Sequence, residues 1–401
     1  MLASLVIDLF KNTDGKNSVR RIVYGRVNDG FFNTGQPEKS FVDCGTSTRS
    51  NRLAKALRTV IINLVVFLVL VGMIEGLVRF LKSEIGPQNL DRSLFDPYKY
   101  GRTYGYKPLA KGEEFGALFV TDEYGFRTSS RSLERNASVK IFVLGDSVSV
   151  GVGVAAEQTY PSLLEEKLGK KVLNASVTGY ALVDYVRVLE SSADKFKPEL
   201  IIIGICLNDV APTSQASIVA MVQNRKGQGE TVPDERRYPN VIVRMLRYIN
   251  ANYFNFNNFL RSYSRSYLFF KSVVADTARD FFSADRLSYQ DPKAIEFLTT
   301  QFMELKRLVS GPTALMFVIF PYEYQLRADS LEALEPQNII KEAGRRAGVI
   351  TYDLYDELTE YLRENRVSSR SLYLFNDPMH FNPVGHRAIA DVLYRYVKRR
   401  E

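Results

Sequence analysis

The chain has 401 residues, of which 45% are hydrophobic, enough for one large domain or two ordinary ones with a packed core. The formal net charge is +8, but residues 1–58 carry ten Lys and Arg against five Asp and Glu, and the remaining residues carry 43 against 40. The bulk of the chain is therefore close to neutral. It lacks the concentrated basic face of a nucleic-acid-binding protein, so we expect no nucleic-acid partner.

The two cysteines, Cys44 and Cys206, lie on opposite sides of an apolar segment, and we expect no disulfide between them. No CxxC motif or Cys/His cluster suggests a metal site, and we predict neither a metal nor an organic cofactor. The whole chain contains two histidines, His380 and His386. Any histidine chemistry must therefore come from that one neighbourhood.

The apolar segment covers residues 59–74, TVIINLVVFLVLVGMI, without a charge. A helix rises about 1.5 Å per residue, so this run spans roughly 24 Å, and flanking apolar residues extend it to 57–81. Glu75 and Arg79 are four residues apart, and we expect them to pair on one helix face. We interpret 57–81 as a transmembrane helix, with a buried core helix as the alternative.

Basic residues gather just before this segment, at Arg49, Arg52, Lys55 and Arg58. The positive-inside rule then places the N-terminus in the cytoplasm and the chain after about residue 82 outside it, in the periplasm or the extracellular space. No small-residue cleavage site follows, which favours an uncleaved signal anchor over a cleaved signal peptide. Residues 1–56 are predicted to be a mostly flexible cytoplasmic leader, and a translation start downstream of Met1 is the alternative.

The segment 139–401 alternates short apolar runs with helical patterns, which indicates a parallel sheet covered on both faces. Active sites of such sheets form at the carboxyl ends of the strands. The strand-like runs are 140–145, 171–177, 199–207, 313–321 and 349–355.

Two regions do not follow this alternation. Residues 82–138 contain YGYKPLAKG and TDEYGFRTS, and we expect an irregular or small β segment that links the membrane helix to the sheet and packs on its edge. Residues 211–291 form an insertion, crowded with Tyr, Phe, Asn and Arg at 247–270. This insertion is either a lid or substrate platform, or a helical pair that packs its aromatic rings on the core.

Ser147 follows the first predicted strand directly, in the sequence GDSVSVGVGV. Gly145 permits a tight turn from strand to helix, which would present Ser147 near a helix N-terminus, where backbone N–H groups favour a developing negative charge. Asp and Ser are also ordinary helix caps, so this motif alone is weak.

A second motif lies in NDPMHFNPVGH, where Asp377 and His380 are three residues apart. This spacing lets the carboxylate accept a hydrogen bond from the imidazole, which fixes its tautomer and stabilises the imidazolium, the role of the acid in a catalytic triad. We interpret His380 as a catalytic base for Ser147 and His386 as structural.

Two further residues follow predicted strands. Asn208, in ICLNDV, has a side-chain amide that would donate to an oxyanion, and Gly179, in NASVTGY, would offer its backbone N–H. With the Ser147 N–H they would form an oxyanion hole. A turn and helix cap at Asn208, and a plain turn glycine at Gly179, are the alternatives.

These four blocks, in this order, resemble the SGNH (GDSL) hydrolase family over about residues 139–398. The resemblance implies a three-layer α/β/α flavodoxin-like fold with a central parallel sheet. It implies Ser147 as nucleophile, Gly179 and Asn208 in the oxyanion hole, and Asp377 and His380 completing the triad. Cys206 occupies the glycine position of the usual Gly-x-Asn-Asp block. Residues 151–168 and the EYGFR sequence are similar to a membrane-anchored bacterial subset, some of which modify surface or exported polysaccharides.

The predicted activity is a serine esterase that cleaves O-acyl esters, with O-acetyl favoured, of a small molecule or an exported or surface polysaccharide. An O-acyltransferase would use the same triad and pass the acyl group to a sugar hydroxyl instead of water. A non-catalytic polysaccharide-binding or assembly component is the third alternative. The oligomeric state is not predicted.

Overall fold

The computed structural model describes residues 47–132, 138–210, 218, 222, 256–257, 259–309, 311–328 and 330–400. Contacts divide the chain into two compact units, residues 1–65 and 66–401. The predicted leader up to residue 46, and much of the predicted insertion up to residue 255, lie outside the described residues.

Helix α1, Ser47–Leu81, contains the predicted membrane segment. The helix ends where predicted, but it begins within the predicted leader, so residues 47–56 are helical. Residues 54–81 are long and apolar enough to cross a membrane, with a mean hydropathy of 2.6, although a signal sequence would also meet this criterion. The expected pair near its end is confirmed, with Arg79 Nε 2.8 Å from Glu75 Oε1.

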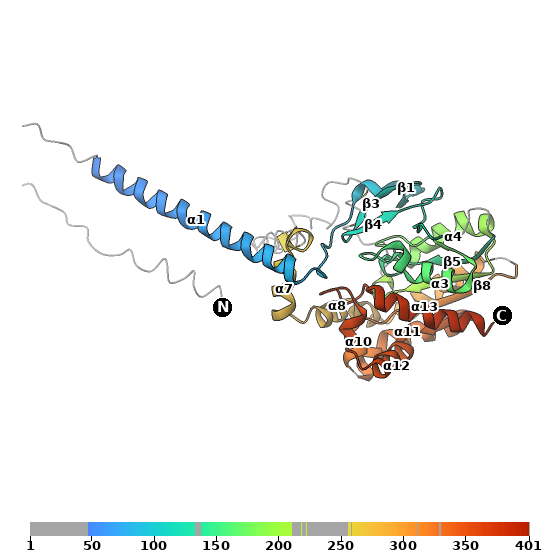
Figure 1. Cartoon of the computed structure of the whole chain (residues 1–401). Coiled ribbons are helices and arrows are strands. Elements are labelled where there is room, and N and C mark those ends of the chain that lie inside the picture. The colour runs from blue at the N-terminus through green and yellow to red at the C-terminus, as the bar shows by residue number, and fades with distance from the viewer. Residues whose placement is uncertain are drawn as a thin grey trace, which may run out of the picture. The chain divides into compact units, whose positions relative to one another are not determined.

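The second unit is built on a five-stranded parallel sheet with the order β6-β5-β7-β8-β9 (Figure 1). The three central strands are runs of mostly apolar residues, which suits burial by helices on both faces. Every strand-like run predicted from the sequence is confirmed. The strands are β5 (Val139–Leu144), β6 (Lys171–Asn174), β7 (Leu200–Ile205), β8 (Ala314–Ile319) and β9 (Ile350–Asp353).

Helices cover this sheet in two layers, which completes the predicted flavodoxin-like α/β/α architecture. One layer is made of α4, α9 and α11, and the other contains α3 packed against α13, with α12 beside α13. Their bounds are α3 (Tyr160–Leu168), α4 (Leu182–Phe196), α9 (Ala294–Arg307), α11 (Glu335–Ala347), α12 (Tyr355–Asn365) and α13 (Pro383–Lys398).

The segment ahead of the sheet folds into two antiparallel hairpins, as the expected small β segment. Tyr104, Tyr106 and Phe119 from these hairpins are almost completely buried in the main hydrophobic core. The hairpins therefore belong to the body of the domain. They are β1 (Phe95–Tyr100) with β2 (Thr103–Tyr106), and β3 (Lys111–Glu114) with β4 (Ala117–Val120).

Four short helices complete the described chain near the carboxyl edge of the sheet. In the described part of the aromatic insertion, Leu268 is buried, whereas Phe259, Tyr263 and Phe270 are exposed. Those three rings do not pack on the core, whereas Phe269 packs against the small cluster that contains Leu268, so both alternatives for the insertion stay predictions. The helices are α2 (Ser147–Val150), α7 (Arg265–Val274), α8 (Thr277–Arg286) and α10 (Glu323–Ala328).

Candidate active site

Ser147 is the first residue of α2, three residues after β5 ends. Asp146 caps this helix, because its Oδ1 accepts a hydrogen bond from Val148 N at 2.9 Å. The turn requires Gly145, since a Cβ there would lie 2.4 Å from Ser149 Oγ. The strand, the glycine and the cap together fix Ser147 at the carboxyl edge of the sheet.

His380 and Asp377 approach this edge from the loop before α13. His380 Nε2 lies 2.8 Å from Ser147 Oγ, and His380 Nδ1 lies 2.7 Å from Asp377 Oδ2. Asp377 Oδ1 also accepts the backbone N–H groups of Met379 and His380. The three predicted residues therefore form one hydrogen-bonded chain from carboxylate to imidazole to hydroxyl.

The loop that carries the histidine is itself held firmly. Asn382 caps α13 by accepting from Val384 N and Gly385 N. Its side chain donates to Ser371 O and Tyr373 O, and the His380 carbonyl accepts from Leu374 N at 2.9 Å. This network fixes the backbone on both sides of His380, so its ring has a defined position against Ser147.

Neighbouring charges shift the acid–base groups of this chain. Burial lowers the pKa of His380, but the Asp377 carboxylate, its hydrogen bond and the charge of Asp146 outweigh burial and raise that pKa above the ordinary value. Burial raises the pKa of Asp377, but His380 outweighs it and the net pKa is lowered. Asp377 is therefore a carboxylate that stabilises an imidazolium.

Gly179 lies after β6 with a φ of +81°, a conformation that favours glycine. A Cβ there would lie 2.4 Å from Ile218 Cδ1 and 2.9 Å from the Tyr104 hydroxyl oxygen. Neither the Gly179 nor the Ser147 amide donates to another group within the described chain. Both N–H groups are therefore free to donate to an oxyanion.

Asn208 lies in the short 3-10 helix Leu207–Val210 that follows β7. Its side chain is half-buried, and its Oδ1 has no partner among the described residues. Asp209 closes the turn, since its Oδ2 accepts from Cys206 N at 2.8 Å and from the Tyr185 hydroxyl at 2.9 Å. Cys206 does not have a positive φ, so the turn accepts a cysteine where the family block has glycine.

Two buried tyrosines hold the loop that carries Gly179, and the sequence analysis gave them no role. The Tyr104 hydroxyl donates to Thr178 O at 2.8 Å. The Tyr106 hydroxyl lies 2.8 Å from Thr178 Oγ1 and 2.9 Å from Glu114 Oε1. Burial raises the pKa of Glu114 to about 7. We call Tyr104, Tyr106, Glu114 and Thr178 the hairpin clamp.

Arg127, from the EYGFR sequence, holds the loop on the other side of Ser147. Its Nη1 donates to Val150 O at 2.8 Å, and its Nη2 donates to Val154 O at 2.6 Å. The guanidinium also lies 4.7 Å from the centre of the Phe119 ring. This buried arginine therefore binds backbone carbonyls at the end of α2 and in the loop that follows it.

His386 occupies a different environment from His380. It is buried in α13, and its Nδ1 accepts from the backbone of Tyr160, the first residue of α3, at 3.2 Å. Burial lowers its pKa to about 3, so it remains neutral. These contacts agree with the structural role predicted for this histidine.

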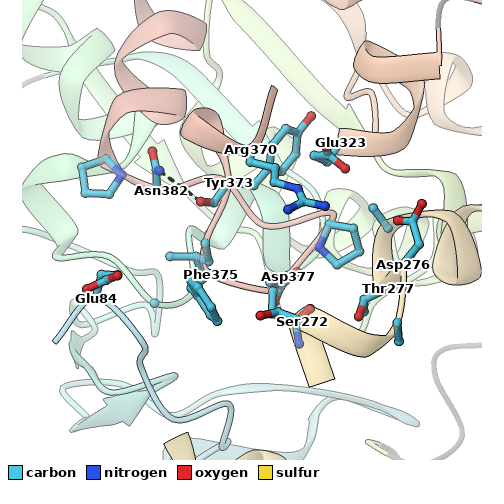
Figure 2. A pocket seen from close by; sticks show the side chains of 17 residues that line it. Glu84, Ser272, Asp276, Thr277, Glu323, Arg370, Tyr373, Phe375, Asp377 and Asn382 are labelled. Atoms are coloured by element: carbon cyan, nitrogen blue, oxygen red, sulfur yellow. Dashed lines mark hydrogen bonds between the residues drawn. The ribbon is translucent and has the colours of Figure 1, made fainter. Parts of the chain in front are cut away.

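A cavity of about 520 Å³ borders Asp377 on the side of α7 and α8 (Figure 2). Both polar and apolar side chains line it, and the Thr277 hydroxyl has no hydrogen-bond partner in the described structure. Ser147 and His380 are not among its lining residues. The labelled polar residues are Glu84, Ser272, Asp276, Thr277, Glu323, Arg370, Tyr373, Asp377 and Asn382.

Comparison with known proteins gives a consistent set of relatives. The model of the GDSL-like lipase/acylhydrolase family matches residues 143–388. An arylesterase of Vibrio mimicus is 34% identical over 83 residues, which cover 20% of this chain and 42% of that protein. Esterase TesA of Pseudomonas aeruginosa is 28% identical over 109 residues, covering 25% of this chain and 54% of that protein. The matches thus span about half the length of these relatives.

Solved structures are similar at low sequence identity. The α/β hydrolase LAE5, from the metagenome of Lake Arreo, matches with a TM-score of 0.37 and 14% identity, covering 64% of this chain and 94% of that one. The acetyl xylan esterase AlAXEase matches with a TM-score of 0.36 and 14% identity, covering 65% of this chain and all of the other.

Proposed function

Because the chain belongs to the GDSL-like lipase/acylhydrolase family, we propose that it is a serine esterase that cleaves O-acyl esters with Ser147, His380 and Asp377 as its triad. The observation that carries this proposal is the hydrogen-bonded chain from Asp377 Oδ2 through His380 to Ser147 Oγ. A nucleophile, a base and an orienting acid within hydrogen-bond distance are what acyl transfer through a serine requires.

In the first step, His380 Nε2 accepts the Ser147 proton while Oγ attacks the ester carbonyl carbon. The N–H groups of Ser147 and Gly179 and the side-chain amide of Asn208 donate to the oxyanion. His380 then protonates the leaving alcohol, and an acyl group stays on Ser147. Water, deprotonated by His380, attacks this acyl-enzyme and releases a carboxylic acid with the serine regenerated.

Crowding around the nucleophile supports a small acyl group such as acetyl. Ser147 is 5% and His380 8% exposed. The Phe115 ring lies edge-on to the His380 ring, with their centres 5.4 Å apart, and the Ile218 side chain lies against Gly179. The charged and hydroxyl side chains that line part of the cavity beside Asp377 support a hydroxyl-rich carrier for that acyl group, such as an exported or surface polysaccharide.

The placement of the enzyme is part of the proposal. Residues 54–81 suit a membrane-spanning anchor, and the basic residues before them favour a cytoplasmic N-terminus. The catalytic domain would then act outside the cytoplasm, in the periplasm or beyond it, where exported polysaccharides are found.

The test uses the full chain in detergent micelles. We expect the wild-type protein to react with a fluorophosphonate probe and to hydrolyse p-nitrophenyl acetate, and Ser147→Ala to do neither. Ser191→Ala, at an exposed serine of α4, is the matched control and should retain both activities. Full hydrolysis by Ser147→Ala would refute the assignment of the nucleophile. Comparing acetate release with acetyl transfer on an acetylated polysaccharide then separates an esterase from an acyltransferase.

A further inference from the structure

The end of α1 is attached to the beginning of α7. The Glu75 carboxylate accepts hydrogen bonds from Arg265 N at 2.9 Å, from Ser266 N at 3.0 Å and from Ser264 Oγ at 3.0 Å. Arg79, which is paired with Glu75, also donates to Tyr263 O at 2.9 Å. A carboxylate suits this position because the first N–H groups of a helix lack partners within that helix.

An apolar contact strengthens this attachment. Leu268, on α7, is buried in a small cluster with Val78 from the last turn of α1 and Ile85 just after it. Figure 1 shows α7 beside this end of α1. The position of α7 along α1 is therefore fixed by both polar and apolar contacts.

The attachment to α7 lies at the end of the apolar run of α1. Glu75 is the first charged residue after the uncharged run 59–74. Charged residues near the end of a spanning helix lie toward its boundary with the headgroups, and Glu75 and Arg79 lie in the last two turns of the predicted span 57–81. The first turn of α7 is therefore held at the level of that boundary.

The face of α7 that points away from the domain is apolar. Phe270, Val273 and Val274 are 53%, 69% and 83% exposed. They are spaced i, i+3 and i+4, so they share one side of the helix. Three adjacent apolar side chains in water are unfavourable, at about 25 cal/mol per Å² of exposed apolar surface. Such a face normally marks an interaction site.

We propose that this face of α7 lies in the headgroup region of the same bilayer that α1 crosses, and that it fastens the catalytic domain against the membrane surface. The inference rests on the proposed membrane anchor. Arg265, in the first turn of the same helix, suits an interfacial position beside lipid phosphates, with the apolar side chains pointing into the acyl boundary.

The attachment also reaches the active site. Asn376, which directly precedes Asp377, donates through its side chain to Leu268 O in the middle of α7, at 3.3 Å. Ser272 of α7 lines the cavity beside Asp377 (Figure 2). A domain fastened through α7 thus holds that cavity at the membrane surface, which favours ester carriers that are displayed there.

The absence of tryptophan from the sequence makes the proposal measurable. We would make single-tryptophan variants of the full chain, Phe270→Trp and Val274→Trp, and reconstitute them in phosphatidylcholine vesicles that contain brominated acyl chains. Leu331→Trp is the matched control, since Leu331 is 87% exposed on the unrelated 3-10 helix Leu331–Leu334. Leu68→Trp, inside the apolar run, reports on the anchor.

We expect the bromolipid to quench Val274→Trp and Phe270→Trp at least threefold more than Leu331→Trp, and Leu68→Trp to be quenched strongly. If Leu68→Trp is quenched while both α7 variants match Leu331→Trp, the surface proposal is overturned and the face serves a protein partner instead. If Leu68→Trp is not quenched, the anchor and the surface proposal are both overturned. Fluorophosphonate labelling of Ser147 in the same vesicles reports separately on the proposed esterase.

Discussion

The hydroxyl of Ser147 lies between two acceptors and carries one proton. Its Oγ is 2.8 Å from His380 Nε2 and 3.2 Å from Asp146 Oδ2. Only the first contact leads to a nucleophile, because the proton must leave toward the imidazole. Asp377 favours that direction by stabilising the imidazolium, and the charge of Asp146 adds to the same effect. The carboxylates of Asp377 and Asp146 therefore both raise the pKa of His380.

The Asp377→Asn variant should change the pH dependence as well as the rate. His380 must be neutral to accept the proton, so the acidic limb of kcat/KM follows its raised pKa and lies above the ordinary 6.5. Removing the charge of Asp377 lowers that pKa and leaves the imidazole poorly oriented. We expect the limb to move to lower pH while kcat falls roughly 10³- to 10⁴-fold. Rates of p-nitrophenyl acetate hydrolysis, measured across the pH range, check both the shift of the acidic limb and the fall in kcat.

Asp146→Asn is the companion measurement for this prediction. Asparagine caps a helix about as well as aspartate, so α2 should keep its start at Ser147. The acidic limb of kcat/KM should shift to lower pH, as in Asp377→Asn, but by less. The reason is that Asp377 raises the pKa of His380 more than Asp146 does. An unshifted limb in Asp377→Asn, or a shift to higher pH, would contradict the proposed role of Asp377.

At the scale of elements, the β1–β2 hairpin holds the loop of the proposed oxyanion donor without supplying a reacting group. Tyr104 and Tyr106, from β2, both hydrogen-bond to Thr178, the neighbour of the proposed oxyanion donor Gly179. The Tyr180 hydroxyl in turn donates to Tyr104 O. A donor acts on the transition state only if it is held at the right distance beforehand. The hairpin clamp holds the loop in that position.

Tyr106→Phe tests this positioning role. The substitution removes the hydroxyl that lies between Thr178 and Glu114, so the Gly179 loop loses one of its two tyrosine contacts. We expect kcat to fall roughly tenfold with little change in KM, because the loop acts on the oxyanion and not on the bound ester. Tyr98→Phe, at an exposed tyrosine of β1, is the control and should leave both constants unchanged. An equal loss of kcat in Tyr106→Phe and Tyr98→Phe, or a rise in KM alone, would contradict the role of Tyr106 in positioning the Gly179 loop.

The sequence could predict the sheet and the order of the site residues, since each depends on local patterns. Continuous apolar runs revealed all five strands. Short motifs placed Ser147, Gly179 and Asn208 after three of them, and His380 just before the last helix. The hairpin clamp could not be found this way. Its strands have four residues each, and Tyr104 meets Thr178 across 74 positions of sequence. The attachment of Glu75 to α7 spans 190 positions, and the apolar pattern of α1 does not indicate which other helix it contacts.

At the scale of the whole molecule, the segments that flank the catalytic fold act as its supports. The hairpins ahead of the sheet enter the main core and reach the Gly179 loop, and Arg127 holds the chain that follows α2. The end of α1 reaches the loop of Asp377 through α7 and Asn376. Each side of the proposed triad is thus connected to a segment that lies outside the central sheet, so the stability of those segments affects the site.

Glu114 gives that stability a specific pH dependence. Its pKa is about 7 in the folded protein, against 4.5 for an ordinary glutamate, because burial disfavours its charged form. Between these values the folded state keeps a proton that the unfolded state has lost. The contribution of protonated Glu114 to the stability of the fold is therefore complete below about pH 4.5, and it declines as the pH rises through 7. A shift of this size corresponds to roughly 3 kcal/mol.

The Glu114→Gln variant isolates this contribution, since glutamine has nearly the same shape and does not ionise. We expect the free energy of unfolding of the wild type, minus that of Glu114→Gln, to fall as pH rises from about 5 to about 8, by up to roughly 3 kcal/mol. Urea denaturation of the micelle-bound protein at each pH measures it. Glu113→Gln, at the exposed neighbour on β3, should show no such trend. A difference that stays constant with pH, or grows, would mean that Glu114 is charged in the fold, and the Tyr106 hydroxyl would then bind a carboxylate instead of a neutral acid.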